Sequence, residues 1–139
     1  MRIHFESIPH KEQRYETVGD WWLDAADVLQ VRVSRMSDPR YERLIVIHEI
    51  VEFLLESQLR GGDIKAMRQL VVDTDIFDKA FEATREPDDD ESEPGCEPDC
   101  PVYQGHMAAM AIEQVCAMIL GVNYNAYADE VAAFDQSKD

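Results

Sequence analysis

The sequence predicts an α+β domain of 139 residues, in which a small antiparallel sheet packs on a central buried helix with further helices around it. Three observations predict this class. Residues 2–34 contain short segments of alternating apolar and polar side chains, residues 41–59 are apolar on nearly every face, and the later part of the chain has helical periodicity. With 45% hydrophobic residues, the chain can bury one core, so residues 1–139 are expected to form a single domain.

Short strands are expected in the first quarter of the chain. Arg2–Ser7 and Val28–Ser34 alternate with a period of two, which is typical of strands, and Trp21–Asp24 is short and aromatic. Turn-forming residues at Thr17–Asp20 separate the first of these segments from the second. We expect the three segments to form the antiparallel sheet.

The central helix is expected over Tyr41–Leu59. Asp38 is an N-cap residue, Pro39 suits the first helical position, and Gly61-Gly62 should end the helix. A helix with apolar residues on nearly every face must be covered on most sides. This helix is therefore expected to be largely buried.

Three further helices are expected after the central one, over Ile64–Ala83, Gln104–Leu120 and Asn125–Phe134. The β-branched run Val71–Asp75 is expected to break the first of them in two, and Gly121 is placed to end the second. Residues 86–101 combine four prolines with a dense run of Asp and Glu, which predicts a mobile acidic loop.

Charge and hydropathy exclude two classes of function. The chain has 29 acidic residues against 13 Lys and Arg, a net charge of −16, which disfavours binding along a nucleic-acid backbone. The longest uncharged stretch, Gln114–Ala128, is shorter than the ~20 apolar residues of a membrane span. The polar start lacks the apolar run of a secretory signal, so we expect a cytoplasmic protein whose cysteines are free thiols.

The chemistry is expected in the central helix, where His48, Glu49 and Glu52 stand among aliphatic residues. Side chains four residues apart share a helical face, so His48 and Glu52 can bind one cation. The spacing follows the zinc metallopeptidase pattern H-E-x-x-H, with Glu52 in place of the second His. A buried carboxylate needs such a partner. The alternative is a hydrogen-bonded core histidine with carboxylates that pair with nearby arginines.

A zinc site needs a third protein ligand, for which His106 in the first turn of the late helix is the best candidate. Glu113, seven residues on, shares its face and could orient a ligand, or it is a surface charge. Cys96 and Cys100 are spaced like a second metal motif, but no other Cys pair or Cys/His pair exists to complete a structural site. A solvated linker is the expected role of that segment.

Residues over most of the chain carry a resemblance to a known family. They are Ile8-Pro9-His10, Gln13-Arg14-Tyr15, residues 17–22 and 31–34, Tyr41-Glu42, His48–Glu52, Phe77-Asp78, Phe81-Glu82, Pro101, Tyr103, His106, Ala109, Ile112-Glu113, Leu120–Val122 and Tyr127. The chain resembles a family of small uncharacterised proteins encoded largely in phage and prophage genomes. That family pairs an H-E-x-x-E helix with a late segment that carries Tyr and His, and it is similar to minimal zincin-type metallopeptidases. This chain departs from the pattern by one extra residue between Pro101 and Tyr103.

The resemblance implies a zincin-like fold with His48, Glu52 and His106 as metal ligands and Glu49 beside the metal. The expected activity is metal-assisted hydrolysis of a peptide or amide substrate in the bacterial host, with Glu49 as the base and Tyr103 as a donor to the developing oxyanion. Zn²⁺ is the expected ion, and the ligand types also suit Fe²⁺, Mn²⁺ or Ni²⁺.

Two non-enzymatic alternatives stay open. One is a phage structural or assembly protein that keeps a metal for stability. The other is an acidic mimic of nucleic acid that binds a basic host protein. The sequence assigns no role to Asp75, Asp78 or the acidic loop.

Overall fold

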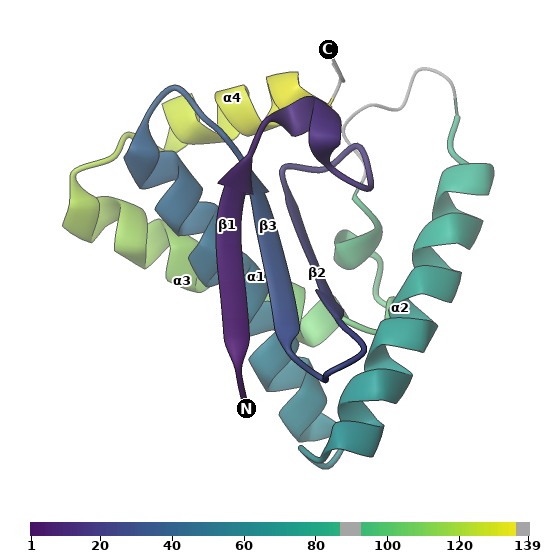
Figure 1. Cartoon of the computed structure of the whole chain (residues 1–139). Coiled ribbons are helices and arrows are strands. Elements are labelled where there is room, and N and C mark those ends of the chain that lie inside the picture. Colours follow the sequence, from purple (N-terminus) through teal and green to yellow (C-terminus); the bar gives the residue numbers. More distant parts are fainter. Residues whose placement is uncertain (87–92, 136–139) are drawn as a thin grey trace.

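The computed structural model describes residues 1–86 and 93–135, and it confirms the α+β class. In Figure 1 the sheet lies in front of α1, α3 lies behind, α2 stands to the right and α4 crosses the top. The bounds are β1 (Ile3–Ile8), β2 (Gly19–Leu23), β3 (Leu29–Ser34), α1 (Pro39–Leu59), α2 (Ile64–Ala83), α3 (Tyr103–Leu120) and α4 (Tyr124–Asp135), with short 3₁₀ helices η1 (His10–Glu12) and η2 (Pro94–Cys96).

The sheet is mixed, so the prediction of an antiparallel sheet is wrong. β3 is the central strand, with β2 antiparallel on one side and β1 parallel on the other. A period of two shows which face a side chain occupies, but it carries no information about the direction of the neighbouring strand. Leu29, Val31 and Val33 of β3 are fully buried in the core.

α1 begins as its sequence predicts. The Asp38 side chain accepts a hydrogen bond from the Arg40 amide at 2.9 Å, and Pro39 is the first helical residue. The helix packs against the sheet on one side and α3 on the other, and Leu44 and Phe53 are fully buried. Its polar residues in the middle turns are therefore held between two layers.

α2 is one continuous helix, so the predicted break at Val71–Asp75 is wrong. Asp63 caps the helix by accepting a hydrogen bond from the Ala66 amide at 2.8 Å. Within the β-branched run, the buried Thr74 hydroxyl donates to the Leu70 carbonyl at 2.7 Å. Because that bond satisfies the hydroxyl inside the helix, the β-branched residues lower the helix propensity of this segment but do not interrupt the helix.

The predicted acidic loop falls partly on residues 87–92, which lie outside the described residues. Within residues 93–101, Gly95 and Cys100 are buried, whereas Glu93 and residues 96–99 are exposed, as expected for a solvated segment. A Cβ at Gly95 would lie 2.7 Å from the His106 ring, so a glycine is what lets η2 approach α3 this closely.

The predicted end of the helix over Gln104–Leu120 and the predicted lack of a membrane span can both be compared with the structure. Gly121 ends α3 in the left-handed conformation, with a φ of 69°, as predicted. Across residues 1–86 and 93–135, the structure contains no helix whose length and hydropathy would suit a membrane span.

Candidate metal centre

Three side chains converge between α1 and α3. His48 and Glu52 lie one turn apart on α1, and His106 lies in the first turn of α3. The Nε2 atom of His48 is 3.1 Å from the Nδ1 atom of His106 and 3.4 Å from the Oε2 atom of Glu52, and His106 Nδ1 is 2.9 Å from Glu52 Oε2. The structure therefore brings together the three residues that the sequence predicts as ligands.

The triangle of these atoms has the size of a zinc coordination face. In a tetrahedral site with metal–ligand bonds of about 2.0–2.1 Å, neighbouring ligand atoms are separated by about 3.3 Å. The three measured separations lie between 2.9 and 3.4 Å. Two imidazoles and one carboxylate with these separations form a group that could hold a divalent ion.

The second polar atoms of His48 and Glu52 are held by hydrogen bonds, and that of His106 lies near a carboxylate. His48 Nδ1 lies 2.8 Å from Glu113 Oε2, and Trp21 Nε1 donates to Glu52 Oε1 at 3.0 Å. His106 Nε2 lies 3.2 Å from Glu93 Oε2. Such partners orient metal ligands and set the histidine tautomer, because a proton held on the outer nitrogen leaves the lone pair of the inner one for the metal.

The surrounding carboxylates stabilise positive charge on both histidines. Burial alone would lower the pKa of His48, but hydrogen bonds with Glu113 and Glu52 raise it to about 11. The pKa of His106 is raised to about 10 in the same way, against burial, by Glu52 and Glu93. Two protonated nitrogens 3.1 Å apart repel each other, whereas one divalent ion accepts a lone pair from all three inner atoms.

Replacing Glu113 by Gln is expected to weaken zinc binding by roughly 10–100-fold. The amide oxygen can still accept the Nδ1–H of His48, but it no longer carries the charge that raises the basicity of the ring. Zinc affinity, measured by competition with a chelating dye, checks this. Glu97→Gln is the matched control, because it removes the same charge from an exposed side chain. An affinity equal to that of the parent would show that Glu113 does not support a ligand.

Glu49 lies beside the cluster, with its carboxylate against the backbone of β2. A Cβ at Gly19 would overlap the Glu49 side chain, so the glycine provides the space that the carboxylate occupies. Burial, together with the charge of Glu52, raises the pKa of Glu49 to about 8. Burial would also raise the pKa of Glu52, but hydrogen bonds from His106 and His48 lower it instead. The two carboxylates of the motif thus differ in their readiness to take a proton.

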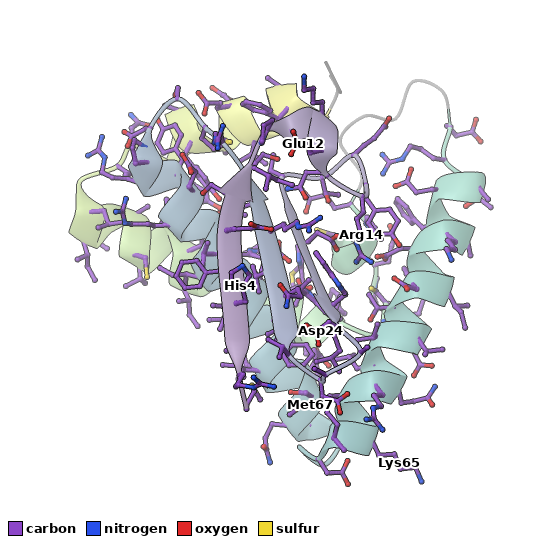
Figure 2. All side chains as sticks on the ribbon, in the orientation of Figure 1. His4, Glu12, Arg14, Asp24, Lys65 and Met67 are labelled. Carbon is purple, nitrogen blue, oxygen red and sulfur yellow. The ribbon has the colours of Figure 1, made fainter. Side chains whose placement is uncertain are left out.

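The remaining candidates lie apart from the three ligands. His4 is exposed on β1, where Figure 2 labels it, and His10 Nδ1 lies 2.8 Å from the Ser34 hydroxyl. Tyr103 is half-buried at the start of α3, and within the described residues its hydroxyl makes no hydrogen bond with the cluster. The predicted role of Tyr103 in catalysis stays a prediction.

Asp78 of α2 carries a shifted pKa near the site. Burial first, and then the charges of Glu52, Asp75, Glu82 and Asp20, raise its pKa from 3.8 to about 7. Asp75, on the same helix, accepts a hydrogen bond from the Tyr15 hydroxyl at 3.4 Å. Because Asp78 interacts with the charge of Glu52, its own negative charge would stabilise a cation bound at the cluster.

Asp78→Asn is expected to stabilise the metal-free protein at pH 8.5 and to have little effect at pH 4. Because the folded pKa is above the unfolded one, the native state binds the extra proton between about pH 4 and 7, and its stability falls as the pH rises through that range. The gain at pH 8.5 should be on the order of 1–2 kcal/mol, after allowance for partial exposure. Thermal unfolding across this pH range checks it. Glu12→Gln, at an exposed position of η1 labelled in Figure 2, should leave the pH dependence unchanged.

Sequence reasoning missed several residues that build the site. Gly105 allows α3 to approach α1: its amide donates to Glu56 Oε1 at 2.6 Å, and a Cβ there would lie 2.8 Å from the Glu52 carbonyl oxygen. Trp21 donates a hydrogen bond to Glu52, and Glu93 lies 3.2 Å from His106, both from distant parts of the chain. A glycine next to the predicted ligand His106 was the one local signal. The roles of Trp21 and Glu93 depend on contacts that no local pattern encodes.

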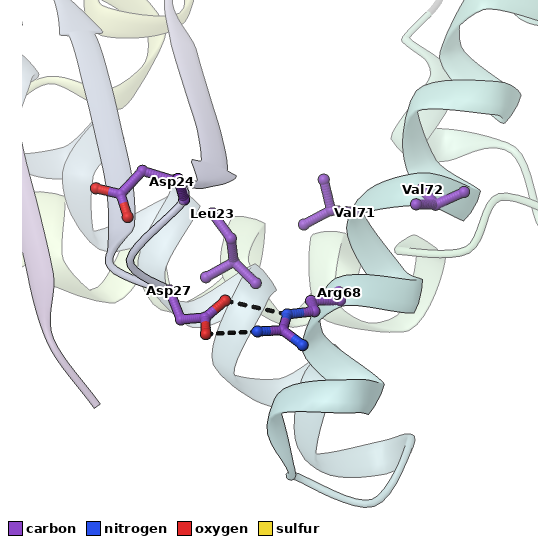
Figure 3. Close-up of a pocket in the computed structure, with 7 residues that line it drawn as sticks. Leu23, Asp24, Asp27, Arg68, Val71 and Val72 are labelled. Carbon is purple, nitrogen blue, oxygen red and sulfur yellow. Dashed lines mark hydrogen bonds and ion pairs between the residues drawn. The ribbon is translucent and has the colours of Figure 1, made fainter.

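Two hollows lie away from the ligands. Figure 3 shows one of about 290 Å³ between α2 and the turn after β2, beside the ion pair of Arg68 with Asp27. The other lies between α1 and α3 and is lined by Leu55, Gln58, Leu59, Gln104 and Gly105. Neither hollow includes His48, Glu52 or His106, whose side chains are at most 12% exposed.

Comparison with protein-family models, curated proteins and solved structures produced no match to this chain. The class of site is therefore defined by its own geometry: a buried group of two histidines and a glutamate with the spacing of a divalent metal centre. The resemblance to the phage and prophage family remains a prediction from the sequence.

Proposed function

We propose that this protein is a zinc-dependent hydrolase of peptide or amide bonds, of phage or prophage origin and with a zincin-like fold, in which His48, Glu52 and His106 bind the ion. The observation that supports this proposal is the convergence of their three inner atoms within 3.4 Å of one another. His48 and Glu52 are each oriented by a hydrogen bond on the outer side, as in zinc sites whose ligands are preorganised.

Glu49 is proposed as the general base. A zinc ion at such a site lowers the pKa of bound water to about 7 and polarises a carbonyl group. Glu49 is adjacent to the ligand His48 in the sequence, and its charge interacts with those of His48, Glu52 and His106. In the absence of a cation the pKa of Glu49 is about 8. A bound cation would lower this pKa toward the range that suits proton transfer near neutral pH.

Tyr103 is proposed to donate a hydrogen bond to the carbonyl oxygen of the substrate as negative charge develops on it. It stands three residues before His106, so the two side chains lie on neighbouring positions of the same helical face. Within the described residues its hydroxyl makes no hydrogen bond with the cluster, and its ring packs against the hydrophobic core.

The test is elemental analysis followed by a hydrolysis screen. Protein purified without a histidine tag or chelator is expected to contain about one equivalent of zinc. Cleavage of peptide and amide substrates should be lost after dialysis against a chelator and restored by zinc. Absence of zinc, even after zinc is added back, would overturn the proposal. Binding of Fe²⁺, Mn²⁺ or Ni²⁺ in preference to zinc would identify another ion for the same ligands.

The burial of the ligands favours a second candidate function, in which the metal stabilises a structural or assembly protein. The side chains of His48, Glu52 and His106 are at most 12% exposed, and a closed site is typical of structural zinc. Removal of the ion would then lower the unfolding temperature without loss of any activity. A stable, zinc-loaded protein that cleaves no substrate in the screen would favour this function.

A further inference from the structure

A second group of possible metal ligands lies on the outer side of His106. It consists of the Nε2 atom of His106, the Glu93 carboxylate and the Cys96 thiol, whose ligand atoms all lie within 4.8 Å of one another. Glu93 Oε2 is 3.2 Å from His106 Nε2 and 4.0 Å from Cys96 Sγ. These atoms are different from the ones that form the first site.

The Nε2 atom of His106 supports a ligand at this position independently. It is buried and, within the described residues, it makes no hydrogen bond of good geometry, although Glu93 lies close by. Buried polar atoms in proteins are rarely left without a partner, and a metal ion is one partner that satisfies an imidazole nitrogen. Its nearest carboxylate oxygen belongs to the segment that carries Glu93 and Cys96.

The local backbone holds these groups together. η2 (Pro94–Cys96) wraps over the His106 ring, and Gly95 is in contact with that ring where any side chain would collide. Glu93 precedes this turn and Cys96 ends it, so the turn presents a carboxylate and a thiol on the same side of the ring. The packing of η2 on α3 thus positions two donors from a segment in which the sequence alone predicted a solvated linker.

We propose that His106 Nε2, Glu93 and Cys96 form a second site for a transition metal of the zinc class, bridged to the first site by the His106 imidazole. Nitrogen, carboxylate and thiolate are all zinc ligands, and the thiolate favours soft ions such as Co²⁺, Zn²⁺ or Cd²⁺ over Mg²⁺ or Ca²⁺. The ion displaces the thiol proton of Cys96 and the proton on His106 Nε2, and both go to solvent.

The second site faces solvent, unlike the first. Glu93 is 47% exposed and Cys96 is exposed, so water completes the coordination and the ion exchanges readily. Binding is therefore expected to be weaker than at the buried triad and to follow it in a titration. The second site does not depend on whether the first one is catalytic, because it is defined by metal binding alone.

The test is a titration of the reduced, metal-free protein with Co²⁺ under anaerobic conditions. Visible absorption reports tetrahedral cobalt at either site, whereas near-ultraviolet charge-transfer absorption requires a cobalt–thiolate bond. The first equivalent is expected to give visible absorption alone, and the second to add the thiolate band. Cys96→Ser should remove the band, weaken the second equivalent by at least 10-fold and leave the first unchanged. Cys116→Ser is the matched control and should keep the band.

The variant His48→Ala distinguishes metal binding at the second site from metal binding at the first. It removes a ligand of the first site only, so the thiolate band is expected with the first equivalent of Co²⁺. In the parent, saturation at one equivalent without a thiolate band, or a band that survives Cys96→Ser, would overturn the second site. A thiolate band with no other cobalt bound would instead overturn the first site and retain the second.

Discussion

Glu49→Gln is expected to lower the rate of hydrolysis by roughly 10²–10⁴-fold, the usual contribution of a general base, while the bound zinc stays at about one equivalent. The amide has nearly the shape of the carboxylate and fits the space that Gly19 leaves, but it cannot take a proton from water. Glu49 contributes no atom to the triangle of His48, Glu52 and His106, so the ion should remain. The measurements are kcat and zinc content on the same preparation.

Two results would contradict this role of Glu49. Loss of zinc from Glu49→Gln would mean that the carboxylate is a ligand, and an unchanged kcat would mean that another group removes the proton. Glu42→Gln provides the control, because it neutralises a carboxylate on the same helix that interacts with the Met36 amide, at the N-terminal end of α1. Its activity and zinc content are both expected to match those of the parent.

His106→Ala is expected to lower zinc affinity by more than ~100-fold, which exceeds the usual effect of losing a partner that only orients a ligand. The change removes the one ligand that α3 contributes and leaves His48 and Glu52 as a pair on one helix. It also opens a void beneath Gly95, where the imidazole now packs. His48→Ala should reduce zinc affinity to a similar degree. Elemental analysis and a competition assay with a chelating dye measure both effects.

His4→Ala is the matched control for both variants, because His4 is exposed on β1, away from the cluster. Circular dichroism of each variant shows whether the fold is retained. If the fold is lost, His106→Gln keeps most of the volume of the side chain and allows the affinity to be measured. Retention of one tightly bound zinc by folded His48→Ala and His106→Ala proteins would show that this triad is not the metal site.

The sequence alone predicted the part of the site that depends on local geometry. Four residues make about one helical turn, so His48 and Glu52 had to share a face once α1 formed. The cap at Asp38 and the glycines after Leu59 were equally local signals, and the bounds of α1 follow them within two residues. Choosing His106 as the third ligand needed only the expectation that the late helix packs on α1, since few other histidines exist.

Only the tertiary structure decided what surrounds those residues. The parallel pairing of β1 with β3, the hydrogen bond from Trp21 to Glu52 and the approach of Glu93 to His106 all join segments far apart in the chain. Residues 93–101 are largely exposed, as their acidic, proline-rich composition predicts, but the burial of Gly95 against α3 depends on contacts that the composition does not show. Local patterns record the conformation of a segment and the face of each side chain. The position of one segment against another is set by the packing of the whole core, and here that packing brings His106 to a motif on one helix and completes a three-residue group that could hold a metal ion.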